Sequence, residues 1–400
     1  MSEAFLVSGK RSPIGKYGGA LSSVRPDDLA ALVIRSVIED SGVPPEAVDE
    51  VILGNANGAG EENRNVARMA WLLNGYPDTV PGVTVNRLCA SGLTAIQFAT
   101  AMIKSGQADI VVAGGVESMT RAPWVTEKPA KAWSPPGRTF NTSIGTRFPN
   151  PRFAEIQPGA TWPMIETAEH VAALKEISRA EADEFGARSQ QRAVKAWQDG
   201  KFASEIVPVE VRSRKGETAI VSEDEGPRPG TTADSLAKLK PATKDDGVCT
   251  AGNSSSLNDG ASAIIVASEA AVKKYQLKAR AKVISFGTSG LAPEVMGLGP
   301  VEATKKALDR AGWSLGQIDA IELNEAFASQ SIACIRELGL DEEKVNAWGG
   351  AIALGHPLGS SGARIVVTLL NRLETEEEKH GLATLCVGVG QGQAITIERI

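Results

Sequence analysis

The segment AVDEVILGNA (residues 47–56) recurs in the second half of the chain as QIDAIELNEA (residues 317–326), and this repeated pattern decides the fold class. Each segment contains a short apolar run followed by an asparagine, which is typical of a buried strand in a mostly parallel sheet. Asp49 and Asp319 hold the same place in the two segments and are 270 positions apart. Further landmarks recur in the same order: Pro26 and Pro300, Val85 and Val345, and the strand-like runs that begin at Asp109 and Ala383. This order predicts an internal duplication.

Amphipathic helical patterns precede both repeated strands, in residues 27–43 and 301–313. Alternation of such helices with buried strands predicts two α/β halves whose sheets are covered on both faces. We therefore divide the chain into an N-terminal half, an insertion and a C-terminal half: residues 1–120 with 251–270, residues 121–250, and residues 271–400.

The insertion differs in composition from both halves. Residues 121–163 contain eight prolines and three tryptophans, which is typical of an irregular but ordered loop. The insertion has 19 Lys and Arg against 18 Asp and Glu, whereas the whole chain has a net charge of -6. A relatively cationic insertion on an acidic protein weakly favours an anionic ligand, although scattered cations are more often a solvated surface.

Composition excludes several classes of protein. With 400 residues, 42% of them hydrophobic, the chain can bury a large core. The net charge of -6 argues against nucleic-acid or anionic-membrane partners, and four cysteines are too few for a disulfide framework. No apolar run is long enough to cross a bilayer, no phosphate-binding glycine motif is complete, and no cysteine spacing suits zinc. We expect a cytoplasmic protein without a bound metal.

Two residues in glycine-containing turns are candidates for nucleophile and base. Cys89 lies where a strand-like pattern meets a helical one, so unpaired backbone amides at the helix start would favour the thiolate. His356 lies in the glycine-rich loop GGAIALGHPLGSSGAR (residues 349–364), where backbone can approach a ligand. A buried structural role remains the alternative for each. If the halves superpose, the two loops occupy equivalent sheet ends and can meet.

Two further candidates end predicted strands. Cys386 precedes a glycine-rich turn, where a thiol can act as acid or base while a neighbouring amide donates to an oxyanion. Asn324 can orient a water or donate to a carbonyl oxygen, while Glu325 is either catalytic or holds its loop by hydrogen bonds. Cys249 and Cys334 lack such settings and are interpreted as core residues.

Six ordered motifs spread over the whole chain together resemble the thiolase family: RSPIGKYGGAL at Arg11, NRLCASGL at Asn86, AGNSSSLNDGA at Ala251, NEAFA at Asn324, GGAIALGHPLGSSGAR at Gly349 and CVGVGQG at Cys386. Three other segments are similar to bacterial β-ketoadipyl-CoA-type thiolases: GEENRNVARMAWLL, ESMTRAPWV and NTSIGTRFPNP.

The resemblance implies two βαβαβαββ halves in a five-layered αβαβα core, with a loop domain that holds coenzyme A. It implies CoA-dependent cleavage of 3-ketoacyl-CoA, or the reverse condensation of two acetyl-CoA, by ping-pong acyl-cysteine chemistry. Cys89 would be the acylated nucleophile, His356 its base and Cys386 the second acid/base. Asn324 would position a water beside His356 in one oxyanion hole, and the amides of Cys89 and Gly388 would form the other.

The resemblance also implies a homodimer or homotetramer, a place in fatty acid metabolism, and no permanently bound cofactor, with CoA and acyl-CoA as substrates. Its loop alignment assigns CoA contacts to Arg228, Ser235, Ser255, Met164, Met296, Ala326 and Phe327. Two departures put chain-length preference in doubt: Val389 stands where a glycine is usual, and Pro163 and His170 replace residues common in relatives.

Other functions compete with this interpretation. A ketoacyl-synthase-like condensing enzyme shares the duplicated fold but pairs its cysteine with two histidines or with His and Asn, whereas here the second position is Cys386. A CoA thioesterase would need a residue reserved for activating water. A non-catalytic acyl-CoA carrier would be expected to lack Cys89, His356 or Cys386.

Overall fold

The computed structural model describes residues 2–212 and 216–400. The first half contains β1 (Ala4–Arg11), β2 (Gly15–Lys16), α1 (Pro26–Ser41), β3 (Glu50–Gly54), α2 (Val66–Leu73), β4 (Gly82–Val85), α3 (Ser91–Lys104), β5 (Ile110–Ser118) and β10 (Asn258–Ser268). The second half contains α8 (Glu269–Lys274), β11 (Ala281–Gly290), α9 (Gly299–Ala311), β12 (Ala320–Leu323), α10 (Ala328–Leu338), α11 (Ala351–Leu354), α12 (Leu358–Thr375), β13 (His380–Val387) and β14 (Gln391–Arg399).

The two halves have the same strand order. The first half runs β4-β3-β5-β10-β1 and the second runs β12-β13-β14-β11, joined where β1 pairs with β11. In the first half, β5 is parallel to β3 on one side and antiparallel to β10 on the other. In the second half, β13 is likewise parallel to β12 and antiparallel to β14. The predicted duplication is confirmed by this common topology.

The repeated aspartates explain why the sequence landmarks recur. The Asp49 carboxylate accepts hydrogen bonds from the backbone N–H groups of Asp109 and Ile110 at 2.7 and 3.0 Å. The Asp319 carboxylate accepts from Lys379 and His380 at 3.0 and 2.9 Å. Each aspartate therefore fixes the start of the neighbouring parallel strand in its own half.

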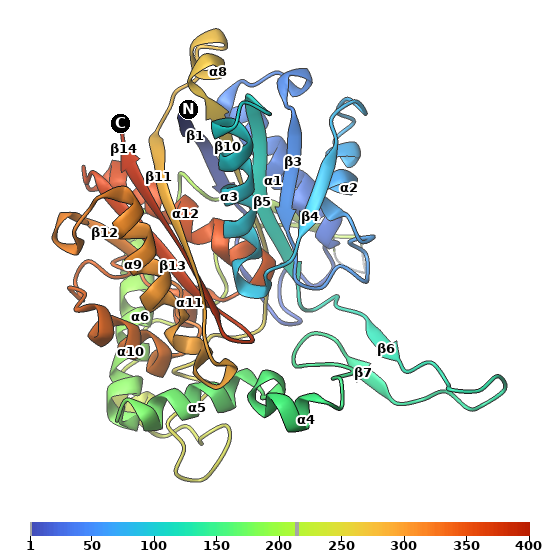
Figure 1. The fold of residues 1–400 in the computed structure, drawn as a ribbon, viewed down its shortest axis with the longest axis vertical. Coiled ribbons are helices and arrows are strands. Elements are labelled where there is room, and N and C mark those ends of the chain that lie inside the picture. Colours follow the sequence, from blue (N-terminus) through green and yellow to red (C-terminus); the bar gives the residue numbers. More distant parts are fainter. Residues whose placement is uncertain (1, 213–215) are drawn as a thin grey trace.

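Helices form layers on both sides of the sheets (Figure 1). α1 and α2 cover the outer face of the first half, α9 and α10 cover that of the second, and α3 and α12 lie between the halves. Side chains alternate across β5, so that Val111 packs in the central cluster while Ile110 and Val112 pack under α1 and α2. This is the expected five-layered α/β core.

One expected strand is almost absent from the second half. Val345, the counterpart of Val85 in β4, makes only a single parallel bridge to Ile321. The Asn346 side chain replaces the missing ladder, because its Oδ1 accepts from the Leu323 N–H at 2.8 Å and its Nδ2 donates to the Leu323 carbonyl at 2.7 Å. A side-chain amide thus pairs with the edge of β12 where a backbone strand would otherwise lie.

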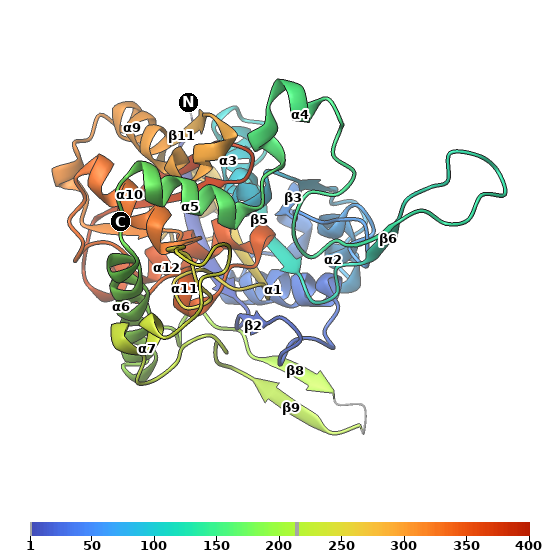
Figure 2. The ribbon, with the colours of Figure 1, turned by 90° about the horizontal axis from the view of Figure 1, so that it is seen from below.

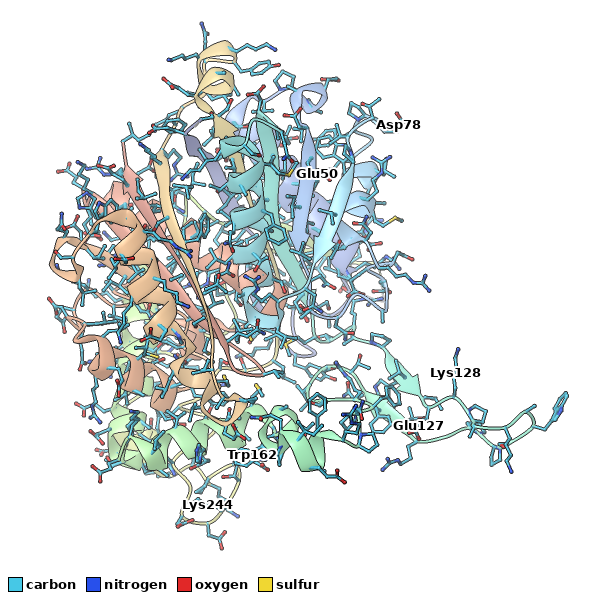
Figure 3. The ribbon with its side chains drawn as sticks, viewed as in Figure 1. Glu50, Asp78, Glu127, Lys128, Trp162 and Lys244 are labelled. Atoms are coloured by element: carbon cyan, nitrogen blue, oxygen red, sulfur yellow. The ribbon has the colours of Figure 1, made fainter. Side chains whose placement is uncertain are left out.

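The segment between β5 and β10 carries short strands and helices together with the 20-residue helix α6: β6 (Trp124–Thr126), β7 (Thr139–Asn141), α4 (Phe153–Ile156), α5 (Met164–Leu174), α6 (Arg179–Gln198), β8 (Val209–Arg212), β9 (Thr218–Val221) and α7 (Ala233–Ala237). The β6–β7 hairpin projects from the body, with Glu127 and Lys128 just beyond the outer end of β6 (Figures 1 and 3), and β8–β9 forms a second projection (Figure 2). We retain the three-part division of the chain as a proposal.

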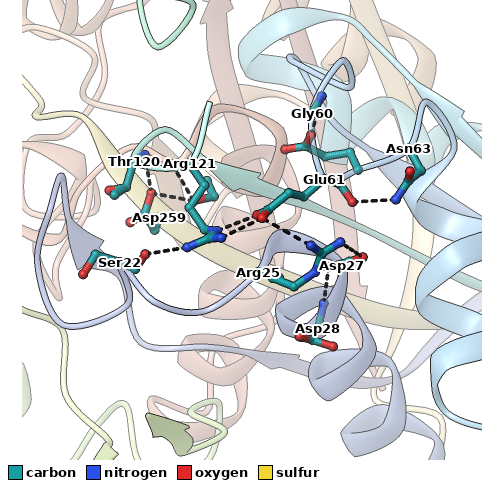
Figure 4. Close-up of polar contacts among 12 residues, drawn as sticks. Ser22, Arg25, Asp27, Asp28, Gly60, Glu61, Asn63, Thr120, Arg121 and Asp259 are labelled. Carbon is teal, nitrogen blue, oxygen red and sulfur yellow. Dashed lines mark hydrogen bonds and ion pairs between the residues drawn. The ribbon is translucent and has the colours of Figure 1, made fainter. Parts of the chain in front are cut away.

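Arg121 anchors the first residues of this segment (Figure 4). Its guanidinium donates two hydrogen bonds to the Glu61 carboxylate at 2.5 and 2.6 Å and a third to the Ser22 carbonyl at 3.1 Å. Arg25, at the start of α1, also contacts Glu61. The chain therefore leaves β5 from a fixed point. Among the described residues no helix is long and apolar enough to cross a membrane.

Candidate active site

Cys89 lies in a tight turn between β4 and α3. The preceding residue, Leu88, has a φ of 47°, in the left-handed region that side chains rarely adopt. The Ser91 hydroxyl holds this turn, since its Oγ accepts from the Arg87 N–H at 2.9 Å and donates to the Leu88 carbonyl at 2.6 Å. A Cβ at Gly54 would lie 2.2 Å from the Ser91 carbonyl carbon, so only glycine lets β3 end against the turn.

The Cys89 thiol is protonated when the protein is free. Burial raises its pKa to about 11, and this outweighs the hydrogen bonds from the backbone N–H groups of Gly388 and Cys89, which lower it. The expectation that the helix start would favour the thiolate is therefore wrong in its net direction. A thiol in this state needs a neighbouring base before it can attack a carbonyl.

His356 is held in a defined orientation and tautomer. Its backbone N–H donates to Asn258 Oδ1 at 2.9 Å, and its Nδ1 lies 2.6 Å from Ser361 Oγ. Because the single Ser361 hydroxyl proton goes to the Pro357 carbonyl at 2.9 Å, Nδ1 carries the hydrogen and Nε2 keeps its lone pair. Burial, and secondarily the positive charge of Arg364, lowers the pKa of His356 to about 3, so the ring is neutral.

The three predicted reactive side chains meet. Cys89, His356 and Cys386 line one cavity of about 390 Å³, although they come from distant parts of the sequence. Burial, and then the neighbouring Cys89, raises the pKa of Cys386 well above its usual value. Fully buried Asn324 lies behind this group, with its Nδ2 3.4 Å from His356 Nε2. The loops of the two halves therefore converge as the duplication predicts.

A second lobe of about 360 Å³ opens from the same cysteine. Both lobes are lined by Cys89, Met119, Met164, Leu358 and residues 143–145. The second lobe alone is lined by Gly388, Val389 and Arg147, together with Trp162 from the turn between α4 and α5 (Figure 3). Val389 has a φ of 63°, so the residue that replaces the usual glycine adopts a glycine-like conformation in the wall of this lobe.

The residues assigned to CoA by resemblance fall into three groups. Five of them line the first lobe with the reactive side chains: Met164, Ser255, Met296, Ala326 and Phe327. Exposed Arg228 lines a separate hollow with Lys16, and Ser256 lies in the wall of both this hollow and the first lobe. Ser235 lines none of these hollows, and its hydroxyl donates to the Thr232 carbonyl at 2.7 Å in the cap of α7.

Glu325 holds a loop, as one of its two predicted roles requires. It is buried, and its carboxylate accepts hydrogen bonds from Ser189, Asn346 and the Ile352 backbone. Sequence reasoning missed Ser361 and Asn258, which orient His356. Their only sequence signal is their place in glycine-rich motifs. Among the described residues, no group of His, Cys, Asp and Glu could hold a metal ion.

Comparisons with known proteins agree with the motifs. A model of the thiolase N-terminal domain matches residues 4–270, and one of the thiolase C-terminal domain matches residues 277–399. A Pseudomonas aeruginosa protein named beta-ketoadipyl-CoA thiolase is 54% identical over 401 residues, covering 100% of this chain and 99% of its own. An Escherichia coli protein named 3-oxoadipyl-CoA/3-oxo-5,6-dehydrosuberyl-CoA thiolase is 52% identical over 403 residues, covering 100% of both chains.

Two solved structures are similar along the whole chain. The Bacillus anthracis acetyl-CoA acetyltransferase superposes with a TM-score of 0.94 at 40% identity, covering 100% of this chain and 99% of the other. The human mitochondrial 3-ketoacyl-CoA thiolase gives a TM-score of 0.91 at 39% identity with the same coverage.

Proposed function

This chain belongs to the thiolase family, and on that premise we propose that Cys89, His356 and Cys386 carry out its acyl transfer. The enzyme cleaves a 3-ketoacyl-CoA with CoA to acetyl-CoA and a shortened acyl-CoA, or condenses acetyl units in the reverse direction. The observation that carries the residue assignment is the shared cavity of the two sulfurs and the neutral imidazole.

The first half-reaction acylates Cys89. His356 Nε2 accepts the thiol proton as the sulfur attacks the 3-keto carbon, and the amides of Cys89 and Gly388 stabilise the resulting oxyanion. The bond between C2 and C3 then breaks, and its electron pair forms the enolate of acetyl-CoA. Protonated His356 and the Asn324 amide stabilise the enolate oxygen. The Cys386 thiol gives its proton to C2, so acetyl-CoA leaves and Cys386 remains a thiolate.

The second half-reaction returns the enzyme to its starting state. The Cys386 thiolate accepts the proton of incoming CoA, and the CoA sulfur attacks the thioester carbon on Cys89. Cys89 leaves as a thiolate and recovers its proton from His356. Because the pKa of free Cys386 is raised by burial and by Cys89, its thiolate is a strong enough base for this step.

The pantetheine arm of CoA is assigned to the first lobe, past Ser255 and Met296, with Arg228 in the next hollow. CoA is then a substrate rather than a resident cofactor. The names of the relatives favour a dicarboxylic 3-oxoacyl chain such as 3-oxoadipyl-CoA, and the role in fatty acid metabolism and the cytoplasmic location stay predictions.

The assay follows thiolysis of 3-oxoadipyl-CoA and acetoacetyl-CoA by the wild type and by the Cys89→Ala and Cys386→Ala variants. We expect wild-type turnover and a loss of at least about 10³-fold in each variant, since each removes an obligatory group. Cys334→Ala, which removes a buried cysteine outside the cavity, is the matched control. The proposal would be contradicted if the wild-type enzyme cleaved none of the 3-ketoacyl-CoA substrates.

The predicted homo-oligomer is supported by two surfaces. In the described residues β4 pairs only with β3, so one edge of this strand is open, with exposed Val83 on it and exposed Leu73 on α2. The β6–β7 hairpin carries exposed Trp124 and, at its outer part, fully exposed Trp133. We propose dimerisation through β4 and tetramerisation through the hairpin. Light scattering should give a tetramer that becomes a dimer when the hairpin is shortened.

A further inference from the structure

Arg147 is a cation without a partner in the wall of the reactive cavity. It lines the second lobe together with Cys89, and its Nε is fully buried without a hydrogen-bond acceptor. Within residues 2–212 and 216–400, its side chain makes no hydrogen bond or ion pair. An unpaired, partly buried guanidinium costs stability, because it loses water without gaining an acceptor.

The neighbouring acid is already occupied by backbone donors. Glu117 lines the same lobe, but its Oε2 accepts hydrogen bonds from the Ala56 N–H at 2.9 Å and the Gly359 N–H at 2.8 Å. Burial raises the pKa of Glu117 to about 7, so a large fraction is uncharged near neutral pH. Glu117 therefore fixes the loops around it. Burial lowers the pKa of the Arg147 guanidinium, and the charge of Glu117 acts on it from a distance in the opposite direction, but the two side chains make no direct ion pair.

Two of the three hydroxyl side chains that line this lobe, Thr142 and Ser143, are also committed, and the third is the exposed Thr146. The Thr142 hydroxyl donates to the Pro123 carbonyl at 2.5 Å, and the Ser143 hydroxyl donates to the Met119 carbonyl at 2.7 Å. Trp162, Met164 and Val389 supply apolar walls. Among the described residues that line it, the lobe is therefore largely apolar and has one uncommitted positive group, which is the arrangement that suits a short acyl chain ending in an anion.

We propose that Arg147 binds the terminal carboxylate of the acyl chain and makes the second lobe selective for ω-carboxylated 3-oxoacyl groups. This inference rests on the proposed function, because it requires the acyl group to be attached to Cys89. A guanidinium and a carboxylate form paired, charge-assisted hydrogen bonds, whereas a methyl-ended chain leaves the guanidinium unpaired. Selectivity arises from that difference between the two chains.

The test compares two substrates of equal length with the same CoA. 3-Oxoadipyl-CoA ends in a carboxylate, and 3-oxohexanoyl-CoA has a methyl group in its place. For Arg147→Met we expect kcat/KM on the diacid to fall roughly 10- to 100-fold, the range for a hydrogen bond to a charged group, with no fall on the methyl-ended substrate. Arg147→Lys should recover part of the loss. Arg152→Met, which removes an exposed arginine of the same segment, should change neither rate.

A measurement on unaltered enzyme covers the case in which the variants fail to fold. Succinyl-CoA should acylate wild-type Cys89 at least about 10-fold faster than butyryl-CoA, which differs only in the terminal group. Equal rates with the two donors, or equal losses on both 3-oxoacyl substrates in Arg147→Met, would overturn the proposal and indicate a structural or CoA-binding role. If wild-type enzyme cleaves neither substrate, the proposed function fails, and this inference fails with it.

Discussion

Replacing Ser361 by alanine should weaken His356 as a base without changing any residue that lines the cavity. The Ser361 hydroxyl accepts from His356 Nδ1 at 2.6 Å, and both residues are buried. Without this acceptor, the ring either leaves a buried N–H unpaired or moves the hydrogen to Nε2, where it blocks acceptance of the Cys89 proton. An unpaired buried group costs about 1–3 kcal/mol. This corresponds to a fall in the acylation rate of roughly 5- to 160-fold.

The assay is the single-turnover rate of Cys89 acylation by acetyl-CoA, measured across pH, beside the unfolding free energy. Ser360→Ala is the matched control, because Ser360 is also buried and its hydroxyl lies 2.6 Å from that of Ser262, away from the imidazole. The reasoning is refuted if Ser361→Ala acylates as fast as Ser360→Ala, or if both lose rate only in proportion to lost stability.

Three further predictions concern strain, the substituted strand and pH. Val389→Gly should raise the free energy of unfolding by about 1 kcal/mol in denaturant melts, because it removes a β-branched side chain from a backbone at φ 63°. Val387→Gly, in buried β13, is the control and should lower the free energy of unfolding by about 3 kcal/mol. A loss of stability in Val389→Gly would contradict the claim that the backbone at Val389 is strained. Asn346→Ala should cost about 3 kcal/mol of unfolding free energy, since it removes both bonds to Leu323 and one to Glu325, and a cost below about 1 kcal/mol would show that the side chain does not replace a strand. Burial lowers the pKa of His356 to about 3, below its unfolded value of about 6.5, so the unfolded state binds the extra proton and stability falls as pH falls from about 7 to 3. His356→Gln should make that fall less steep, and an unchanged slope would be inconsistent with a neutral buried ring.

The repeated landmarks predicted the topology because they mark backbone interactions that each half needs. Asp49 and Asp319 bind the starts of equivalent strands, so their recurrence at the same place in each half indicated the duplication. The same logic placed Cys89 and His356 at equivalent sheet ends, and they line one cavity. The lone bridge at Val345 could not be predicted, because replacement of a strand by the side chain of Asn346 depends on tertiary contacts.

Features that depend on burial or on the inserted segment were not visible in the sequence. The helix start at Cys89 suggested a lowered pKa, but the depth of the site reverses the sign. Arg147 lies in NTSIGTRFPNP, a segment similar to β-ketoadipyl-CoA-type thiolases, but its role was not assigned, because only the folding of an irregular, proline-rich loop places it in the wall of the lobe that Cys89 also lines. Ser361 lies in a predicted helix, and nothing in the sequence indicates that its hydroxyl contacts the imidazole of His356.

The most direct measurement of the central claim is the mass of the protein and of its peptides after brief incubation with acetyl-CoA. We predict one acetyl group on the wild type, on the peptide that contains Cys89. Cys386→Ala should keep this group, Cys89→Ala should have none, and His356→Gln should acquire it far more slowly. Acetyl on any other residue, or equal labelling of Cys89→Ala, would contradict the assignment of the nucleophile and the convergence of the two halves on it.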